Sequence, residues 1–236
     1  IHRASNFLTS LENAIRADRG RGAAEHQQAI GNLLAGYAKV AHDNPLAVRR
    51  EGFTAEQIAT VSADNRYIGF PYTRLMNSNP YIDQSAAVIM TSVGKARELG
   101  IDPSKWVYLH GCGDGWDHWW LTERVNYHSS PAIRTVAGRA FGMAGKTPAD
   151  MDFLDLYSCF PAAIQIGAQE IGIAEDDPRG LTVTGGLPFF GGPGNNYVTH
   201  SIAEMMNKVR GKPGSFGLCT ANGHNVTKHG AGIYST

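Results

Sequence analysis

Residues 151–173, MDFLDLYSCFPAAIQIGAQEIGI, contain the change from strand to helix that decides the fold of this chain. MDFLDLYS predicts a short strand that is largely apolar, and CFPAAIQIGAQEIGI predicts an amphipathic helix directly after it. Such a strand, followed at once by a helix, is the unit from which layered α/β domains are built.

The same alternation continues on both sides of this unit. Upstream, WVYLHG (106–111) predicts a strand, and 130–145 predicts a helix with Ser130 as N-cap and Pro131 at its first position. The aromatic-rich stretch 112–130 receives no assignment. Downstream, the predicted elements are a strand, a helix and two closing strands at 181–186, 196–211, 214–221 and 231–236. The order from residue 106 is β-α-β-α-β-α-β-β, which predicts an α/β domain with a mostly parallel sheet.

The first hundred residues are mainly helical in pattern. Residues 5–17 place Phe7, Leu8, Leu11, Ala14 and Ile15 on one helical face, and 25–45 form a second such helix through Ile30, Leu33, Leu34, Tyr37 and Val40. A short third helix is expected over 53–61, with a capping box between Thr54 and Gln57. An irregular loop (65–84), a buried strand (85–92) and a helix (94–100) follow.

Composition limits the classes of function. With 42% hydrophobic and 18% charged residues, the chain has enough apolar side chains for a sizeable core. Lys plus Arg and Asp plus Glu both number 21, which argues against nucleic acid or an anionic membrane as the main partner. We find no membrane-length apolar stretch and no signal peptide. The three cysteines form no CxxC pair, so a reducing cytoplasm is expected. Because the chain opens at Ile1, we expect a fragment or the ordered part of a longer protein.

Four stretches carry candidate chemistry. Tyr157 lies at the carboxyl end of a predicted strand, where a phenol could transfer a proton or could simply pack at the sheet edge. The loop 184–196, TGGLPFFGGPGNN, could admit a ligand to its backbone or could be a glycine-rich structural turn. Cys219, near His224 and His229, could be a nucleophile or base, or a small buried hydrophobe.

The fourth stretch is HGCGDGWDHWW (110–120). It holds five side chains that bind metals in other proteins: His110, Cys112, Asp114, Asp117 and His118. Their spacing matches none of the common zinc patterns, so we expect no metal site there. Three of the four tryptophans fall in this stretch, which predicts a packed aromatic loop.

The carboxyl-terminal loops, taken together, resemble those of thiolases. SPAIRTVAGRAFGMAGKTPADMDFLDLYSCFPAA is similar to the thiolase helix and strand that lead into "NEAF". TVTGGLPFFGGPGNN is similar to the "GGxxxxGHPxGxTG" loop, and GLCTANGHNVTKHGAGIYST to the final "CxGGGxG" hairpin. Residues 70–100 resemble the end of the thiolase amino-terminal domain. The turn YSCFP resembles the "HDCFS" version of sterol-carrier-protein-2-type (SCP2-type) thiolases and thiolase-like proteins.

The resemblance implies the layered α-β-α-β-α thiolase fold, of which only the second βαβαβαββ half is complete here. It implies three regions: a helical part of the loop domain (1–59), the end of the amino-terminal domain (60–105) and the carboxyl-terminal domain (106–236). Acyl-CoA would be the substrate, with no covalently bound cofactor. Thiolases are commonly dimers or tetramers, so a homodimer is one expected partner state.

The resemblance also assigns roles residue by residue. Cys219 matches the thiolase cysteine that shuttles the alpha proton, although Ala221 replaces the glycine of that motif. Tyr157 stands where thiolases have Asn or His, and Gly192 stands where the "GHP" histidine is expected. The acylated cysteine of thiolases falls before the matched region. His224 and His200 are the histidines that could substitute. Substrate-binding residues by this resemblance are Gly191, Gly192, Pro193 and Gly223.

Three functions follow. The first is a thiolase-like acyltransferase of the acetyl-CoA acetyltransferase type in lipid metabolism, with Cys219 as base. The second is a retro-aldolase on CoA-thioester side chains that uses Tyr157, alongside a small OB-fold partner protein or domain. The third is a catalytically impaired acyl-CoA-binding protein. Loss of the "GHP" histidine removes an oxyanion donor, which typically costs about 3 kcal/mol of transition-state stabilisation.

Overall fold

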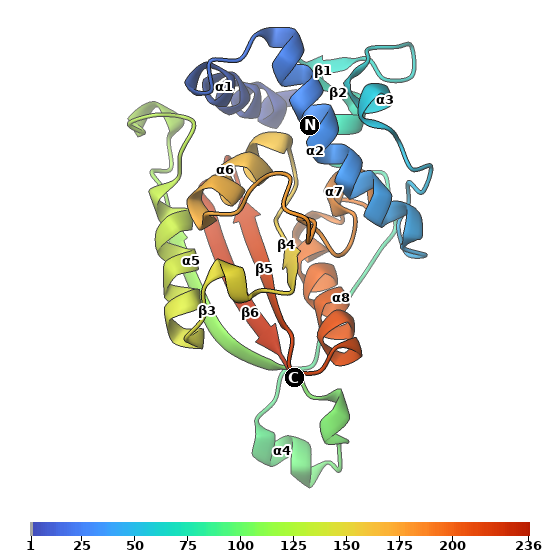
Figure 1. Ribbon diagram of the computed structural model, residues 1–236, viewed down its shortest axis with the longest axis vertical. Helices are drawn as coiled ribbons and strands as arrows, with labels where there is room; N and C mark the ends of the chain where they lie inside the picture. Colours follow the sequence, from blue (N-terminus) through green and yellow to red (C-terminus); the bar gives the residue numbers. More distant parts are fainter. Residues whose placement is uncertain (1) are drawn as a thin grey trace.

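A mixed four-stranded sheet lies at the centre of the molecule, as the computed structural model shows (Figure 1). The structure describes residues 2–236, with side chains described from Leu8 onward. The prediction that Phe7 lies on the apolar face of the first helix therefore falls outside the described side chains. The strands of this sheet are β3 (Tyr108–Trp116), β4 (Phe153–Asp155), β5 (Phe216–Gly223) and β6 (Lys228–Ser235).

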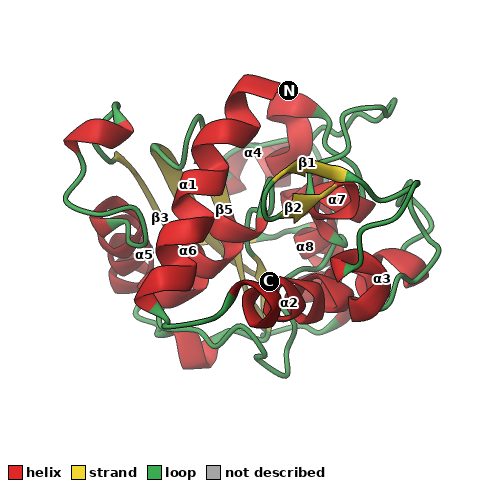
Figure 2. Ribbon diagram, turned by 90° about the horizontal axis from the view of Figure 1, so that it is seen from above, coloured by secondary structure: helices red, strands yellow, loops and turns green. Residues whose placement is uncertain are grey.

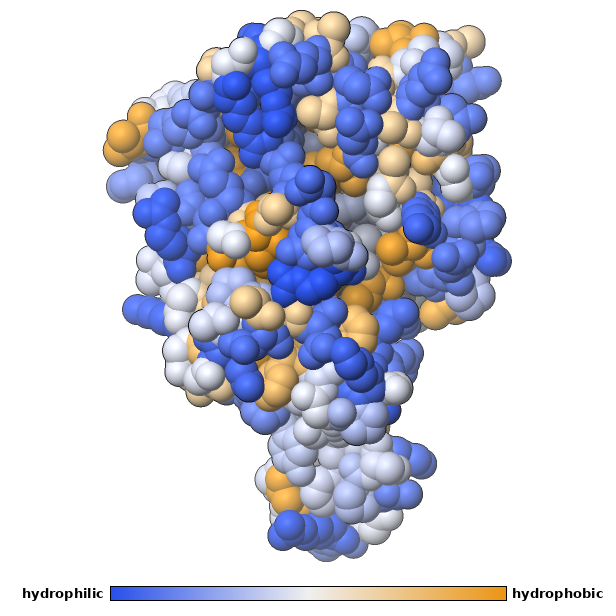
Figure 3. All heavy atoms as spheres, in the orientation of Figure 1, coloured by the Kyte–Doolittle hydropathy of each residue, from blue (hydrophilic) through white to orange (hydrophobic). Residues whose placement is uncertain are grey.

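Helices cover both faces of the sheet. The helices α5 (Pro131–Ala144) and α6 (Pro161–Ile171) lie on one face, and α8 (Tyr197–Gly211) lies on the other. The helices α1 (His2–Asp18), α2 (Ala23–Asp43) and α3 (Ala55–Ala59) gather at one end of the sheet (Figures 1 and 2). At the opposite end, α4 (Val93–Glu98) forms a small projecting lobe, on which Figure 3 shows one small apolar patch.

The amino-terminal helices confirm the predicted pattern. Leu8, Leu11 and Ile15 of α1 are buried, as are four of the five apolar residues predicted for α2, with Val40 half-buried. The capping box of α3 is present, because Thr54 Oγ1 accepts from Gln57 N at 3.2 Å and Gln57 Oε1 accepts from Thr54 N at 2.8 Å. The predicted irregular loop contains one short hairpin, β1 (Tyr67–Gly69) with β2 (Tyr72–Thr73).

The expectation of a mostly parallel sheet is wrong. The strand order is β3-β6-β5-β4, and only β4 and β5 are parallel, because β6 runs antiparallel to both of its neighbours. A tight turn joins β5 to β6, and such a turn can only connect antiparallel strands. Since β6 separates β3 from β5, the strands β3, β4 and β5 still end at the same edge of the sheet.

Residues 181–186 form no strand, contrary to the prediction. They make a buried loop that leads into the short helix α7 (Gly186–Phe189). The fully buried carboxylate of Asp155 accepts the backbone N–H groups of Val183 and Thr184, at 2.9 Å and 3.3 Å. These N–H groups are therefore not free for a strand ladder, and one bond, from Leu156 N to Leu181 O at 2.9 Å, resembles strand pairing.

Residues 85–92 also form no strand. The segment belongs to no sheet, and its apolar side chains face solvent, with Ile89 89% and Met90 83% exposed. The sequence pattern was that of a buried strand, and a strand needs a neighbour to satisfy its backbone groups. No neighbouring strand lies beside this segment in the part of the chain that the structure describes.

The unassigned aromatic stretch extends β3 to Trp116, beyond the predicted end at residue 111. Gly111 and Gly113 face α5, and a Cβ on them would lie 2.0 Å from Ala140 O and 2.5 Å from Val136 O. Glycine therefore permits the close approach of β3 and α5. The prediction of a packed aromatic loop is wrong, because the three tryptophans are substantially exposed: Trp116, Trp119 and Trp120.

One apolar core joins the amino-terminal helices to the sheet. It runs from Leu8 and Leu34 through Leu156 and Phe189 to Ile233. This continuity fixes α1 and α2 over the edge at which β3, β4 and β5 end (Figure 2). None of the described helices is both long and apolar enough to cross a membrane.

Candidate active site at the carboxyl edge of the sheet

Two of the predicted loops, the turn at Tyr157 and the glycine-rich loop 184–196, meet the end of β5 where β4 ends. Tyr157 N donates to Thr220 Oγ1 of β5 at 2.9 Å, and Ser158 Oγ accepts from Leu187 N of α7 at 3.0 Å. Segment 77–79 closes the group, since Ser78 N donates to Cys159 O at 3.2 Å. Ligands in open α/β sheets bind at such an edge.

Tyr157 is half-buried within this group of loops. Its ring packs edge-on against the Tyr197 ring, with the centroids 5.5 Å apart and the planes at 90°. Burial raises the pKa of the Tyr157 phenol well above its ordinary value, and the neighbouring Cys159 raises it further. The phenol is therefore neutral near pH 7, so it can donate a hydrogen bond to a carbonyl or an enolate oxygen.

Asp155 organises the buried side of the site. Besides the two N–H groups already described, its Oδ2 accepts from Thr182 Oγ1 at 3.0 Å, and its Oδ1 accepts from Tyr197 OH at 3.2 Å. Burial raises the pKa of Asp155 despite these bonds. The carboxyl thus fixes the loop 182–184 and the Tyr197 ring on which Tyr157 packs. Sequence reasoning missed Asp155 and Tyr197, although an acid inside an apolar strand is itself a signal.

Cys219 lies on the face of β5 that α8 covers. Its side chain is 3% exposed and belongs to an apolar cluster with Val183, Met205 and Val209. Burial raises the pKa of the thiol far above its ordinary value, and the Asp155 carboxyl raises it further. The structure therefore holds Cys219 as a protonated thiol shielded from solvent, which is the environment of a buried hydrophobe.

His224 lies at the exposed tip of the β5–β6 hairpin. Its ring stacks near the Trp119 ring, with centroids 4.5 Å apart, and its φ is +59°. It is four positions after Thr220, which is roughly 13 Å along an extended strand. The structure thus places His224 and the adjacent Gly223 toward the end of β3 rather than beside Tyr157.

The glycine loop packs against the protein itself. A Cβ on Gly191 would meet Gln84 Oε1 at 2.3 Å, and one on Gly192 would meet Ser78 Oγ at 2.1 Å. Gly192 N also donates to Asn79 O at 2.8 Å. These two glycines are required for close packing of segment 78–84. The following residues, from Pro193 to Asn195, are more exposed.

His200 of α8 is the histidine that lies beside this loop. Its ring centroid is 5.3 Å from that of Phe190, which also contacts Tyr197. Tyr197 and His200 are three residues apart, so they share one face of α8. Burial lowers the pKa of His200, and its Nε2 has no hydrogen-bond partner among the described residues. His200 is thus a neutral imidazole with a buried, unpartnered nitrogen, and the rings of Tyr197 and Phe190 lie between it and Tyr157.

The candidate metal ligands of 110–118 do not form a cluster. Within residues 2–236, no group of three or more His, Cys, Asp and Glu side chains is arranged to hold a metal ion. Cys112 and Asp114 lie along β3, while Asp117 is bonded to Ser130 and His229.

Comparisons with known proteins match the fold described above. The structure superposes with a TM-score of 0.91 on a monomeric SCP2-thiolase like protein type 1 from Mycobacterium smegmatis, at 43% identity, covering 98% of this chain and 51% of that one. A 3-ketoacyl-CoA thiolase from Escherichia fergusonii is 29% identical over 161 residues, which are 61% of this chain and 35% of the relative. No family model matches the chain.

The fold is that of the thiolase superfamily, and the chain is similar in sequence to members of it. Within this superfamily it is similar to the SCP2-thiolase-like proteins. A second structure, an Ltp2-ChsH2(DUF35) aldolase, shares the fold with a TM-score of 0.78 at 18% identity, over 99% of this chain and 63% of that one. The chain spans about a third of the curated thiolases and about half of the Mycobacterium smegmatis protein.

Proposed function

We propose that the protein carrying this chain acts on acyl-CoA thioesters and makes or breaks a carbon–carbon bond next to the thioester carbonyl. The 3-ketoacyl-CoA thiolases among its relatives act on such esters by name, which supports this substrate class. No covalently bound cofactor is part of the proposal. The substrate would reach the edge beside Pro193 and the exposed residues Gly194 and Asn195, with Gly191 and Gly192 shaping the loop. Gly223, which the resemblance also assigns to substrate binding, lies away from this entry.

Within this class we favour retro-aldol cleavage of a β-hydroxyacyl-CoA thioester. The observation that carries the choice is the contrast between Tyr157, a neutral phenol at the edge, and Cys219, a thiol buried under α8. In the reaction, a base removes the proton of the β-hydroxyl group and the Cα–Cβ bond breaks. Its electron pair forms the thioester enolate, whose oxygen accepts a hydrogen bond from Tyr157. A proton then returns to the α carbon.

His200 is our candidate for the base in this scheme. Burial keeps its imidazole neutral near pH 7, and the Nε2 atom has no partner among the described residues. The ring chain from Tyr157 through Tyr197 and Phe190 to His200 links it to the site. A neutral imidazole with a free nitrogen is the usual general base of proteins.

Thiolysis of the acetyl-CoA acetyltransferase type is the second candidate function. The likeness of Cys219 to the thiolase proton-shuttling cysteine and the 3-ketoacyl-CoA thiolase relatives favour it. It would require Cys219 to become accessible as a thiolate. It would also require His224 or another histidine to replace the thiolase histidine at whose position this chain has Gly192. The structure we describe supplies neither condition.

The proposal extends to domains, partners and location. We assign residues 1–59 to a loop domain, 60–105 to the end of the first thiolase half and 106–236 to the second half. The expected partners are a second copy of the chain and a small OB-fold protein or domain. The OB-fold partner belongs to the retro-aldolase proposal. We expect a cytoplasmic location.

The test measures two kinds of substrate with the protein that carries this chain. Acetoacetyl-CoA with free CoA reports thiolysis through loss of the enolate absorbance, and a β-hydroxyacyl-CoA panel reports aldol cleavage through release of a ketone or aldehyde. The proposal predicts cleavage without thiolysis. Thiolysis alone would favour the second candidate, whereas binding without turnover would leave an acyl-CoA-binding protein.

A further inference from the structure

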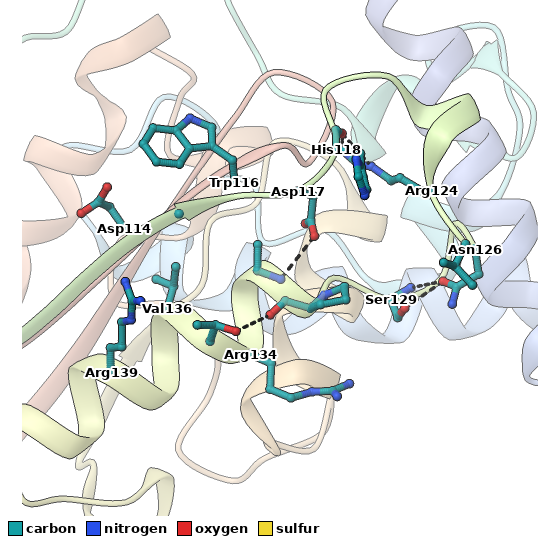
Figure 4. Close-up of a pocket in the computed structure, with 15 residues that line it drawn as sticks. Asp114, Trp116, Asp117, His118, Arg124, Asn126, Ser129, Arg134, Val136 and Arg139 are labelled. Carbon is teal, nitrogen blue, oxygen red and sulfur yellow. Dashed lines mark hydrogen bonds between the residues drawn. The ribbon is translucent and has the colours of Figure 1, made fainter.

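An imidazole–carboxylate pair lies where the end of β3 meets β6 and the start of α5. Nε2 of His229 lies 3.0 Å from Oδ2 of Asp117, and the two side chains are 2% and 9% exposed. Asp117 also accepts from Ser130 Oγ and from Ala132 N at 3.2 Å, and Figure 4 shows its carboxylate pointing from β3 toward α5. Since a carboxylate only accepts hydrogen bonds, the Nε2–H group of His229 donates to Asp117.

Asp117 is negatively charged near neutral pH. Burial alone would raise the pKa of its carboxyl, but hydrogen bonds from His229, Ser130 and Ala132 outweigh burial and hold the pKa below its ordinary value. A carboxylate bonded to one ring nitrogen of a histidine favours the protonated form of that ring, because the opposite charges attract. The pair can therefore hold a proton on the imidazole of His229.

The other charged side chains near this pair come from three elements. Arg124, in the loop after β3, donates to Thr227 Oγ1 of the β5–β6 turn at 2.9 Å. Glu170 of α6 and Arg134 of α5 form an ion pair of 2.8 Å, so their charges offset each other. Among the described residues, Asp117 is the one charged group bonded to the imidazole. The charge state of the ring therefore depends mainly on Asp117.

His229 also lines a cavity of about 20 Å³ between the sheet, α5 and α6. Asn222 of β5 and Tyr157 line the same cavity, together with apolar side chains of both helices. Asn222 and His229 are directly opposite each other in the β5–β6 pair, so their side chains point to the same face of the sheet. The cavity therefore connects the imidazole with Tyr157, the residue that we place in the site.

Two polar atoms of the residues around this cavity are buried and unpaired. Nδ1 of His229 and Oδ1 of Asn222 have no hydrogen-bond partner among the described residues. Buried polar atoms in proteins are nearly always paired, with protein groups or with water. A cavity of at least about 10–15 Å³ holds one water molecule. A water between these two atoms accepts from the Nδ1–H group of the imidazolium and donates to Oδ1, and its second O–H group remains available.

We propose that His229 and Asn222 hold one water molecule beside Tyr157, and that His229 supplies through it the proton that returns to the α carbon. The inference rests on the retro-aldol reaction proposed above, in which the source of this proton is unassigned. Once the Cα–Cβ bond has broken, the α carbon of the enolate takes a proton from the water, and the water takes the Nδ1 proton of the imidazolium. Asp117 keeps its negative charge, and the neutral ring regains a proton from solvent. His229 is thus a positioning residue that acts through the water.

Exchange of α protons tests this step separately from carbon–carbon cleavage. The protein that carries this chain is incubated with propionyl-CoA in D2O, and mass spectrometry follows the uptake of deuterium at the α carbon. The exchange runs the proposed transfer in both directions, because the α proton leaves to the water and a deuteron returns from it. Removal of the α proton needs the neutral ring, so exchange by the parent should rise as the pH rises through the titration of His229.

Two variants report on the two residues that hold the water. His229→Gln should slow exchange about 100-fold and remove its pH dependence, since general acid–base catalysis typically contributes about 10²–10⁴-fold. Asn222→Leu removes the acceptor for the water, so it should slow exchange about tenfold while the pH dependence remains. Because Asn222 is only half-buried, this variant keeps the proposal testable if His229→Gln does not fold.

The matched control is His26→Gln. His26 of α2 is a second fully buried histidine bonded to a carboxylate, since its Nε2 lies 2.6 Å from Oε1 of Glu12 in α1. This variant loses the same kind of buried pair away from the cavity, so it should lower stability and leave exchange and its pH dependence unchanged. Unfolding curves show whether each variant is folded.

The outcomes separate this inference from the proposed reaction. Exchange at the parental rate in folded His229→Gln or Asn222→Leu overturns the inference, even where cleavage of a β-hydroxyacyl-CoA supports the retro-aldol reaction. Exchange without cleavage by the parent refutes the retro-aldol reaction, while loss of exchange in His229→Gln still supports the role of the water. A parent that shows neither exchange nor cleavage overturns both.

Discussion

Asp155 is the residue on which the candidate site depends most directly. It is fully buried, and it holds the loop 182–184 and the Tyr197 ring in place through five protein groups. A buried acid whose hydrogen bonds are nearly complete still resists ionisation, because burial disfavours the charged form. The stability of the site should therefore depend on pH.

We expect Asp155→Asn to gain stability relative to the parent as the pH rises from about 4 toward neutrality. Burial raises the pKa of Asp155 in the folded state. An acid of this kind stabilises the fold below its unfolded pKa, and that contribution is lost as the pH rises through its folded pKa. Urea unfolding of both proteins across this range measures the difference. A difference that stays constant or shrinks with pH would contradict the assignment.

The three cysteines should react with a thiol-specific disulfide reagent in a fixed order. Cys112 is exposed and should react first. Cys159 is partly exposed, but burial of its sulfur raises its pKa to about 12, so it should react more slowly. Cys219 should react only after unfolding in denaturant. Fast labelling of Cys219 in the native protein, identified by mass spectrometry, would show that the thiol is accessible and would favour thiolysis.

At the scale of elements, the turn into α7 depends on Gly186. Gly186 has φ +74°, and a Cβ on it would lie 2.4 Å from the Tyr37 ring and 2.6 Å from Ser158 Oγ. We expect Gly186→Ala to lower the free energy of unfolding by about 2–4 kcal/mol, from backbone strain and overpacking. Gly36→Ala is the control, since Gly36 lies in α2 with open space around it. This substitution should raise the free energy of unfolding by about 0.5–1 kcal/mol, because alanine favours a helix more than glycine does. Equal effects of both changes would refute this packing role.

The elements that could be predicted are those whose signals are local. The cap at Ser130 and the capping box at Thr54 set helix starts from neighbouring residues, and both helices form as expected. The segment 181–186 was wrongly predicted to be a strand, because the bonds that shape it as a loop come from Asp155, far away in sequence. For the same reason Tyr157 was recognisable from its place after a strand, whereas its contact with Tyr197 was not.

At the scale of the whole molecule, the segment 85–92 is the clearest exposed apolar stretch among the described residues. Val88, Ile89 and Met90 are 38%, 89% and 83% exposed in a stretch whose pattern is that of a buried strand. Exposed apolar side chains of this kind mark surfaces that another segment or partner covers, which supports our proposal that 60–105 belongs to the first thiolase half.

Ile89→Lys should change the free energy of unfolding of this chain by less than about 0.5 kcal/mol, because the side chain packs on nothing here. Ile58→Lys is the matched control; that side chain is fully buried, so the substitution should unfold the chain. Chemical denaturation measures both, and size-exclusion chromatography should show less self-association for Ile89→Lys. A large loss of stability at Ile89 would mean that the segment is already covered.

The central claim is that Tyr157, and not Cys219, carries the chemistry of this site. The most direct measurement is the rate of cleavage of a β-hydroxyacyl-CoA by the parent protein, Tyr157→Phe and Cys219→Ala, with unfolding curves to show that each variant is folded. Loss of one preorganised hydrogen-bond donor typically costs about 10²–10³ in kcat, so Tyr157→Phe should fall by that factor while Cys219→Ala retains most of its activity. The reverse result, with Cys219→Ala inactive and Tyr157→Phe unchanged, would contradict the account and identify the site as that of a thiolase.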